Sequence, residues 1–149
     1  MKFKTIHPNT IGLMMALIFT PVMAKALTVQ VRQIETARQG QIIVMLFAND
    51  GFPKDHAKAL SIQTRPVTSD VSSLAFEFAV NTREFAVKVL HDEDMNNKVT
   101  KNWTGIWPAE GLGFSNGARV RLSGAPSFKD ARLTLSANQD VIDIPLIYP

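Results

Sequence analysis

Short runs of alternating apolar and polar residues, separated by turns, dominate this chain. The alternation is clearest in Leu27–Arg32, Leu74–Val80 and Phe85–Val89. A period of two places one face of each run in a core and the other in solvent, which predicts β-strands. Further extended runs are expected near residues 62–67, 119–122, 132–135 and 141–148.

One run differs from the others, because Gln41–Ala48 is apolar at every position after its first residue. This pattern predicts a central strand that is covered on both faces. Pro145 cannot donate to a strand ladder, so the last run is expected at a sheet edge or a bulge. Only Pro53–Leu60 resembles a helix, and it is a short connector. About seven strands without alternating long helices predict an all-β chain folded as a single antiparallel β-sandwich.

Residues 1–26 are typical of a cleavable signal peptide. A basic start precedes an apolar run over 11–22, and these twelve residues are too few for a helix to span a bilayer core of about 30 Å. The A-x-A pattern that ends at Ala26 predicts cleavage there, with cleavage after Ala24 as the alternative. The β-sandwich domain would then occupy 27–149 and be periplasmic or secreted, without a transmembrane segment. An uncleaved anchor is the other interpretation.

Charge and cysteine content exclude several classes of function. The chain holds 16 Lys and Arg residues against 13 Asp and Glu residues, but three of the basic residues and none of the acidic ones lie in 1–26. The remainder is neutral, which disfavours nucleic acid as a partner. The chain has no cysteine, which excludes thiol catalysis and thiolate metal sites.

The segment 92–117 shows neither strand nor helix periodicity. Loops of this length are usually functional or disordered. Disordered tracts are poor in large apolar residues, whereas this segment holds two tryptophans, Ile106, Leu112 and Phe114. We therefore expect an ordered loop that serves as the working face of the protein.

The start of this segment carries oxygen ligands at alternate positions, as calcium-binding loops do. With Asp92 as position 1, the candidate calcium ligands are Asp92, Asp94, Asn96, the carbonyl of Lys98 and Thr100. Position 6 is Asn97 where such loops have Gly, and position 12 is Trp103 where they have a bidentate Glu. The alternative is a solvated turn in which the same side chains bond their own backbone.

Three stretches of the chain follow the motifs of a known family. Phe85–Lys98 is similar to a strand and loop that read YAV-x-V-x-HDENGNGKLD, and Pro108–Asn116 is similar to a loop GIP-x-EG-x-GFSN. Pro126–Ala131 matches a later segment with Pro-Ser-Phe before an Ala. The chain therefore resembles the bacterial family catalogued as domain of unknown function 2141.

This resemblance implies an exported β-sandwich related to transthyretin-like and carboxypeptidase-regulatory-like modules, and it brings no assigned activity. The chain departs from the family in the acidic loop, where residues 94–100 read DMNNKVT. Both family glycines and the last aspartate are missing. If the family loop holds a cation, these changes would weaken cation binding in this chain.

The aromatic and acidic side chains of the loop predict a ligand-binding surface. Its candidate residues are Trp103, Trp107, Glu110 and Phe114. Apolar ring faces beside hydrogen-bonding groups suit a sugar or a peptide strand. The alternative is that the aromatic side chains only close the end of the sandwich over the core.

Catalysis is the competing interpretation. In this interpretation the protein is a hydrolase or lyase, and its general acid and base come from His91, Asp92 and Glu110. His91, however, is in phase with Phe85 and Val87 on the inward face of its strand, so we expect it to be structural. We expect no catalytic residue. The sequence predicts an exported, non-enzymatic module that binds an unidentified envelope ligand or protein, with calcium as its candidate cofactor.

Overall fold

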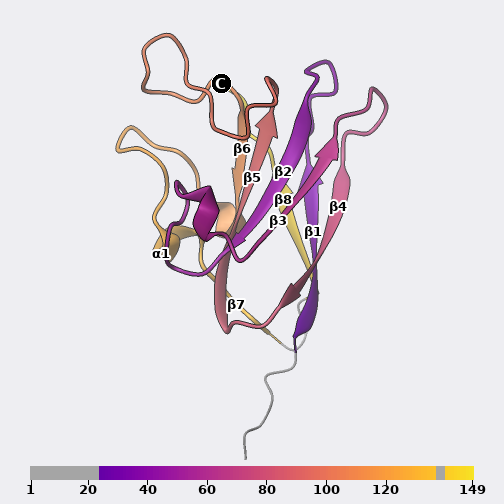
Figure 1. Ribbon diagram of the computed structural model, residues 1–149, viewed down its shortest axis with the longest axis vertical. Coiled ribbons are helices and arrows are strands. Elements are labelled where there is room, and N and C mark those ends of the chain that lie inside the picture. Colours follow the sequence, from indigo (N-terminus) through magenta and orange to yellow (C-terminus); the bar gives the residue numbers. More distant parts are fainter. Residues whose placement is uncertain (1–23, 137–139) are drawn as a thin grey trace, which may run out of the picture.

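The computed structural model describes residues 24–136 and 140–149, which fold as two β-sheets packed face to face (Figure 1). These residues form eight strands, one four-residue α-helix and two single turns of 3-10 helix. The predicted all-β class is confirmed. Residues 1–23, which hold most of the expected signal peptide, lie outside the described residues. Within the described residues no helix is long and apolar enough to cross a membrane.

The smaller sheet has the order β4-β1-β8 and consists of β1 (Lys25–Arg32), β4 (Leu74–Val80) and β8 (Val141–Pro145). β1 is antiparallel to β4. One pairing departs from the expected antiparallel arrangement, since β8 runs parallel to β1. The cause is the path of the chain, which crosses from the larger sheet before it enters β8. Pro145 ends this strand at the sheet edge, where its missing N–H breaks no ladder.

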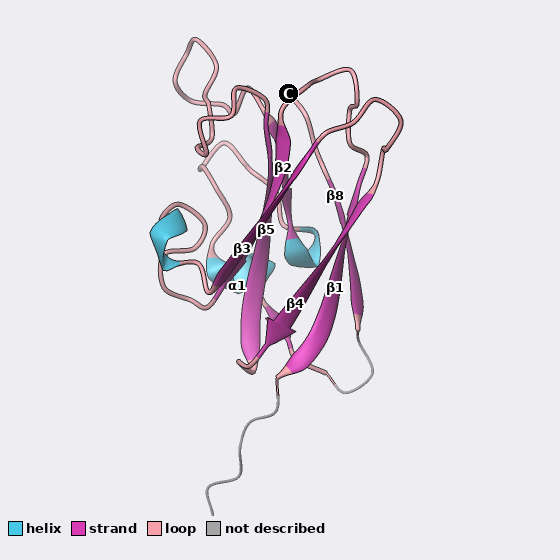
Figure 2. Ribbon diagram, turned by 45° about the vertical axis from the view of Figure 1, so that its right-hand side comes forward, coloured by secondary structure: helices cyan, strands magenta, loops and turns pink. Residues whose placement is uncertain are grey.

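The larger sheet has the order β3-β2-β5-β6, with β7 beside the start of β5. Its strands are β2 (Gln41–Phe47), β3 (Ser61–Pro66), β5 (Glu84–Asp92), β6 (Gly111–Phe114) and β7 (Leu133–Thr134). Figure 2 shows β2, β3 and β5 on one side of the molecule and β1, β4 and β8 on the other. β5 has neighbours on both edges, and every residue from Phe85 to Asp92 is buried.

The core between the sheets is made of the inward residues of the alternating strands. Leu27, Val29 and Val31 of β1 face Val87 and Val89 of the larger sheet in one buried apolar cluster. The remaining strands contribute Ile42, Val44, Leu46, Phe76, Phe78, Val80, Phe85, Ile142 and Ile144. The alternation read from the sequence therefore places these side chains correctly.

A second apolar layer covers the outer face of the larger sheet. Met45, Phe47 and Leu90 point into this layer and are fully or nearly fully buried. The covering residues lie in or beside η1 (His56–Lys58), η2 (Ser115–Gly117) and α1 (Phe128–Ala131), and they include Ala59, Ala118 and Phe128. In Figure 1, η1 and α1 lie on the same side of the sheet, to the left of β5 and β6. The predicted burial of both faces of β2 is confirmed.

Three local predictions are wrong. Residues 119–122 form no strand, because the backbone turns back on itself through a bridge between Arg121 and Gly124, and Leu122 is 90% exposed. The helix expected over Pro53–Leu60 is only the single 3-10 turn of η1. The long loop 92–117 is interrupted by β6, so the connecting loop proper is 93–110.

β6 escaped sequence analysis because two of its four residues are glycines, which show no apolar or polar alternation. The packing of β6 against β8 requires a glycine at one of these two positions, Gly113. A Cβ atom on Gly113 would lie 2.7 Å from the Ile144 side chain and 2.9 Å from the Pro145 carbonyl oxygen. Only a residue without a side chain allows β6 to lie this close to β8.

Gly40, just before β2, makes a similar close approach to the end of β5. Its φ is 106°, and a Cβ atom there would lie 2.2 Å from the carbonyl oxygen of Asp92. Gly124 has almost the same φ, 111°, but nothing lies within 4 Å of an added Cβ. The two glycines therefore share a backbone conformation and differ in their surroundings.

We expect Gly40→Ala to lower the free energy of unfolding by about 2 kcal/mol more than Gly124→Ala does. Both variants strain the backbone at positive φ, but only Gly40→Ala also pushes against the backbone of Asp92. Urea denaturation of the two variants measures this difference. Equal losses would contradict the close packing of Gly40 against β5.

Candidate functional site

The loop 93–110 leaves β5 and returns to β6 at one end of the sandwich. In Figure 1 it lies at the top, next to the C-terminus and the connection between β1 and β2. Only its two ends are anchored in the sheet, because β5 ends at Asp92 and β6 begins at Gly111. The polar contacts of Asp92, Asp94 and Glu110 determine how the rest of the loop is held.

Asp92 closes the first turn of the loop. Its side chain is fully buried, and its carboxylate accepts the backbone N–H groups of Asn96 (3.1 Å) and Asn97 (2.9 Å). The Gln41 amide donates a third bond at 2.7 Å. Asn97 has a φ of 61°, the left-handed conformation that position 6 of a calcium loop requires. Asn tolerates this conformation better than most residues do.

Asp94 is exposed and is held by the far side of the same turn. Its Oδ2 atom accepts bonds from the Thr100 hydroxyl at 2.7 Å and from the Asn96 amide at 2.7 Å. The bond from Thr100 lowers the pKa of Asp94 most, and the backbone N–H of Asn96, which donates to Oδ1 at 3.1 Å, lowers it further. The Asn96 Oδ1 atom accepts the backbone N–H of Lys98 at 2.7 Å. The candidate ligands therefore do bond their own loop.

Glu110 reaches the same turn from the other end of the loop. It is buried, and its carboxylate accepts the backbone N–H of Glu93 at 3.1 Å and that of Thr100 at 2.8 Å. Burial raises the pKa of Glu110, and the nearby charges of Asp94 and Asp92 raise it further. The Glu110 side chain therefore connects the end of the loop to its start at Glu93 and to its middle at Thr100.

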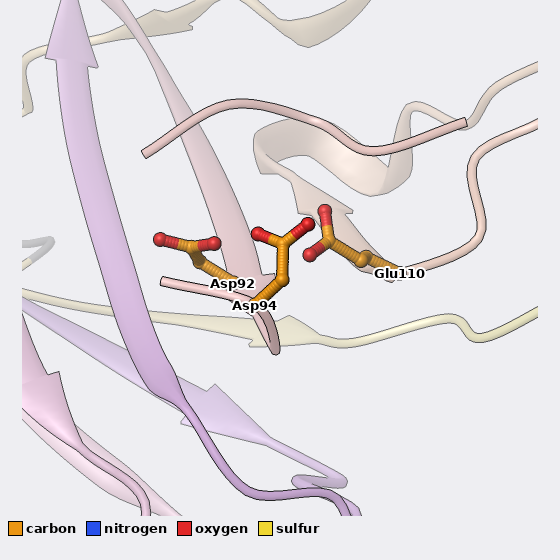
Figure 3. Close-up of side chains that lie close together, drawn as sticks. All are labelled: Asp92, Asp94 and Glu110. Atoms are coloured by element: carbon orange, nitrogen blue, oxygen red, sulfur yellow. The ribbon is translucent and has the colours of Figure 1, made fainter. Parts of the chain in front are cut away.

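The carboxylates of Asp92, Asp94 and Glu110 converge, as Figure 3 shows. One oxygen from each lies within 4.8 Å of the others. The sequence placed Asp92 and Asp94 in a cation site but assigned Glu110 to ligand binding or, in the alternative interpretation, to catalysis. Trp103 occupies the position where a calcium loop has its closing Glu, and the fold brings Glu110 to the group instead. No local pattern in the sequence marked Glu110 as a member of this group.

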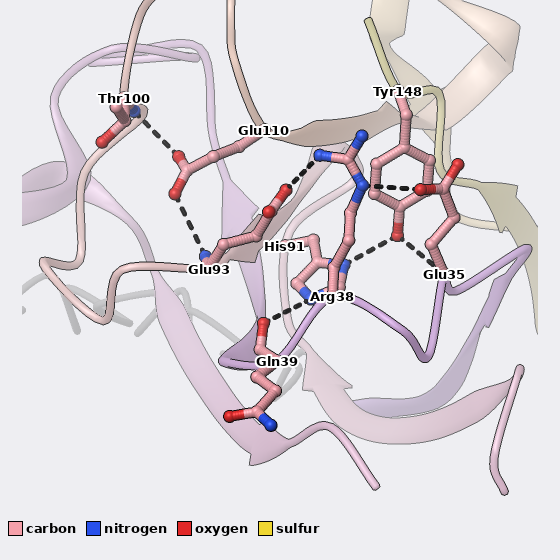
Figure 4. Close-up of polar contacts among 8 residues, drawn as sticks. All are labelled: Glu35, Arg38, Gln39, His91, Glu93, Thr100, Glu110 and Tyr148. Carbon is pink, nitrogen blue, oxygen red and sulfur yellow. Dashed lines mark hydrogen bonds and ion pairs between the residues drawn. The ribbon is translucent and has the colours of Figure 1, made fainter. Parts of the chain in front are cut away.

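His91 has a structural environment. Its Nε2 lies 3.1 Å from the Gln39 carbonyl and its Nδ1 lies 2.7 Å from the Tyr148 hydroxyl (Figure 4). The carbonyl only accepts, so a neutral ring with its proton on Nε2 satisfies both contacts. The Tyr148 hydroxyl in turn accepts the backbone N–H of Glu35. Both ring nitrogens are used, and neither contacts Glu110.

A surface network joins the loop to the rest of this end. Arg38 forms ion pairs with Glu35 at 2.6 Å and with Glu93 at 2.8 Å, and its guanidinium lies 5.0 Å from the centre of the Tyr148 ring. Figure 4 shows these contacts continuing through Glu93 to Glu110. Exposed ion pairs of this kind stabilise a fold only modestly. The network orients the loop against the C-terminal segment.

The aromatic residues of the predicted binding surface do not form one platform. Trp103 is 97% exposed, Trp107 is 36% exposed and Phe114 is buried in the outer apolar layer. Trp107, Glu110 and Phe114 nevertheless line one cleft of about 510 Å³, together with Tyr148. Trp103 does not line this cleft. Three of the four predicted residues therefore share a concave surface.

Lys88 is a buried residue that sequence analysis missed. It lies on the outer face of β5 and is 3% exposed. Its ammonium donates to the Pro53 carbonyl at 3.0 Å and to His56 Nε2 at 2.8 Å. Burial lowers the pKa of Lys88 to about 8. Alternation alone marked this position as solvent-facing, since it does not show that other segments cover the outer face.

We expect Lys88→Met to raise the free energy of unfolding at pH 7, because it removes a buried charge that has no carboxylate partner. The pKa of Lys88 is about 8 in the folded protein against 10.5 for an ordinary Lys, so its charged form costs stability below pH 8. This cost disappears as the pH rises toward 10.5. The advantage of Lys88→Met should therefore shrink by about 3 kcal/mol over this range.

Urea denaturation at several pH values measures this change, with Lys129→Met on the exposed surface of α1 as the control. Lys129→Met removes a lysine that is not buried, so it controls for the loss of a basic residue. A Lys88→Met difference that does not change with pH would contradict the burial of a charged Lys88.

The chain matches a family model among the comparisons with known proteins. No curated protein and no solved structure matches it. A family model described as "Uncharacterized protein conserved in bacteria (DUF2141)" matches residues 29–143, from within β1 to within β8. This range includes the three converging carboxylates, His91 and Lys88. Because the match covers well over half of the chain, the protein belongs to the DUF2141 family of bacterial proteins.

Proposed function

We propose that this protein is an exported, non-enzymatic binding module whose loop 93–110 is organised by a bound calcium ion. The observation that carries the proposal is the convergence of the Asp92, Asp94 and Glu110 carboxylates within 4.8 Å. The first two residues come from the start of the loop and the third from its end. A cation between them would therefore join both ends of the loop.

The chemistry of the group favours a hard divalent cation. Calcium prefers oxygen ligands and accepts carboxylates in irregular arrangements. Three carboxylates this close together repel one another, and a cation removes this repulsion. The raised pKa of Glu110, which reflects burial and the charges of Asp94 and Asp92, is consistent with an anionic site. The left-handed backbone at Asn97 gives the turn the form that calcium loops have.

A cation here would shape the cleft that the loop borders. Glu110 contacts the turn through Glu93 and Thr100 and also lines the cleft beside Trp107 and Tyr148. A ligand in this cleft would meet aromatic rings next to a carboxylate, a surface that suits a sugar or a peptide strand. We propose an envelope ligand or protein of this chemistry as the partner.

The geometry favours binding over catalysis. A hydrolase or lyase that used His91, Asp92 and Glu110 would need a ring nitrogen of His91 open to substrate. His91 is fully buried, and its two nitrogens contact Tyr148 and Gln39. Asp92 is fully buried too, and accepts three hydrogen bonds.

Export through a signal peptide is part of the proposal, and the position of β1 favours cleavage after Ala24. Lys25 and Ala26 pair with Val80 and Ala79, and Lys25 forms an ion pair with Asp140 at 2.7 Å. Cleavage after Ala26 would remove both residues from the strand. We expect the full chain, expressed in a bacterium and recovered from the periplasm, to begin at Lys25 by mass spectrometry. A mature chain that begins at Leu27, or an uncleaved chain, would contradict this expectation.

Calcium should stabilise the protein against heat. For a dissociation constant of about 0.2 mM, about 2 mM calcium adds about 1.4 kcal/mol to the free energy of unfolding. This raises the melting temperature of a domain of this size by about 5 °C relative to excess chelator. Magnesium should have a smaller effect, because it demands a more regular set of ligands. Thermal unfolding followed by circular dichroism measures the shift.

Two isosteric variants separate cation binding from general charge effects. Asp94→Asn and Glu110→Gln each remove one negative charge from the group and should abolish most of the calcium-dependent shift. Glu77→Gln removes a charge from an exposed position on β4 and should retain the full shift. The proposal fails if calcium leaves the wild type unchanged, or if all three variants respond as the wild type does.

A further inference from the structure

A second cavity, of about 620 Å³, opens on the outer side of β5 and β6. Its volume is within the range of small-molecule sites, roughly 300–1,000 Å³. Its walls come from four segments: the region of η1, the strands β5 and β6, the loop residues 97–108 and the turn near 120–125. It adjoins the cleft beside Trp107, with which it shares Pro108, Leu112, Phe114 and Val120, and none of the three converging carboxylates lines it.

The lining of this cavity carries charge of one sign. Its basic residues are Lys54, His56, Lys88, Lys98 and Lys101. Within residues 24–136 and 140–149 no Asp or Glu lines it, and none of the four lysines forms an ion pair. Most other lining residues are apolar, among them Val99, Leu112 and Phe114. The cavity therefore presents cations against an apolar wall.

Of the four lysines that line the cavity, Lys88 is the buried one. An ammonium group has three N–H donors, and Lys88 uses two of them on the Pro53 carbonyl and on His56 Nε2. His56 Nδ1 lies 3.2 Å from the Asn97 carbonyl, so the ring donates there and accepts from Lys88. One N–H of Lys88 remains for a ligand. The lowered pKa of Lys88, about 8, leaves the amine largely protonated at pH 7.

We propose that this cavity binds a small carboxylate with an apolar body, and that Lys88 receives its carboxylate group. A single buried ammonium matches a single negative charge, and a charge-assisted hydrogen bond in a dry site is stronger than the same bond in water. Lys54, Lys98 and Lys101 are exposed and would attract the anion toward the site. The apolar wall would hold the rest of the molecule. None of the three converging carboxylates takes part in this site, although the wall formed by residues 97–108 belongs to the loop that calcium would organise.

The probe for this site is 2-naphthoate, with 2-naphthamide as its neutral counterpart of the same shape. Isothermal titration calorimetry measures both affinities on the purified protein. We expect 2-naphthoate to bind at least about tenfold more tightly than 2-naphthamide. We also expect Lys88→Met to weaken 2-naphthoate by about tenfold or more, while Lys129→Met changes it less than about twofold. Lys88→Met removes a buried charge and is expected to fold.

A second measurement keeps the test independent of any variant. Titration of the ¹⁵N-labelled wild type with 2-naphthoate should shift the amide signals of residues 54–58 and 97–101 first. Inorganic phosphate, which lacks an apolar body, should not displace the probe. The proposal is overturned if naphthoate and naphthamide bind equally, if Lys88→Met retains the wild-type affinity, if phosphate competes as well as naphthoate, or if the shifts lie elsewhere.

Discussion

The site at this end of the sandwich depends on carboxylates that hold main-chain N–H groups. Asp92, buried at the end of β5, fixes the turn that follows it, and Glu110 fixes the start of the loop to its end. A loop of this length has few other anchors, since most of its apolar side chains face solvent and Trp103 is 97% exposed. Hydrogen bonds to ionised groups are the stronger kind, so these two carboxylates hold the two ends of the loop together.

The same arrangement gives the loop its chemistry. Bringing Asp92, Asp94 and Glu110 together concentrates negative charge where the loop closes. Buried carboxylates that repel one another make a poor structural device unless a cation joins them. In the second cavity the sign of the charge is reversed, because Lys88 and other basic residues line it and no acidic group among the described residues does. Asn97 contacts both environments, since its N–H donates to Asp92 and its carbonyl lies 3.2 Å from His56 Nδ1.

Much of this fold follows from the sequence because it depends on local pattern. The alternation in β1, β4 and β5 identified the core-facing residues, and the unbroken apolar run of β2 showed that both of its faces are covered. β6 could not be found in this way, because Gly111 and Gly113 serve a contact with distant segments rather than an alternating pattern. The role of Glu110 in the carboxylate group and the burial of Lys88 were missed for a related reason. Segments far away in the chain determine the surroundings of both residues, and no local pattern reveals them.

The central claim is that Asp92, Asp94 and Glu110 hold one cation, and its most direct test is a calcium titration of the ¹⁵N-labelled protein followed by NMR. The backbone N–H groups of Glu93 and Thr100 donate to Glu110, and those of Asn96 and Asn97 donate to Asp92. The account predicts that these four amide signals shift first and together, with a single dissociation constant. Unchanged signals, or shifts spread over unrelated acidic residues such as Asp140 and Asp143, would contradict it.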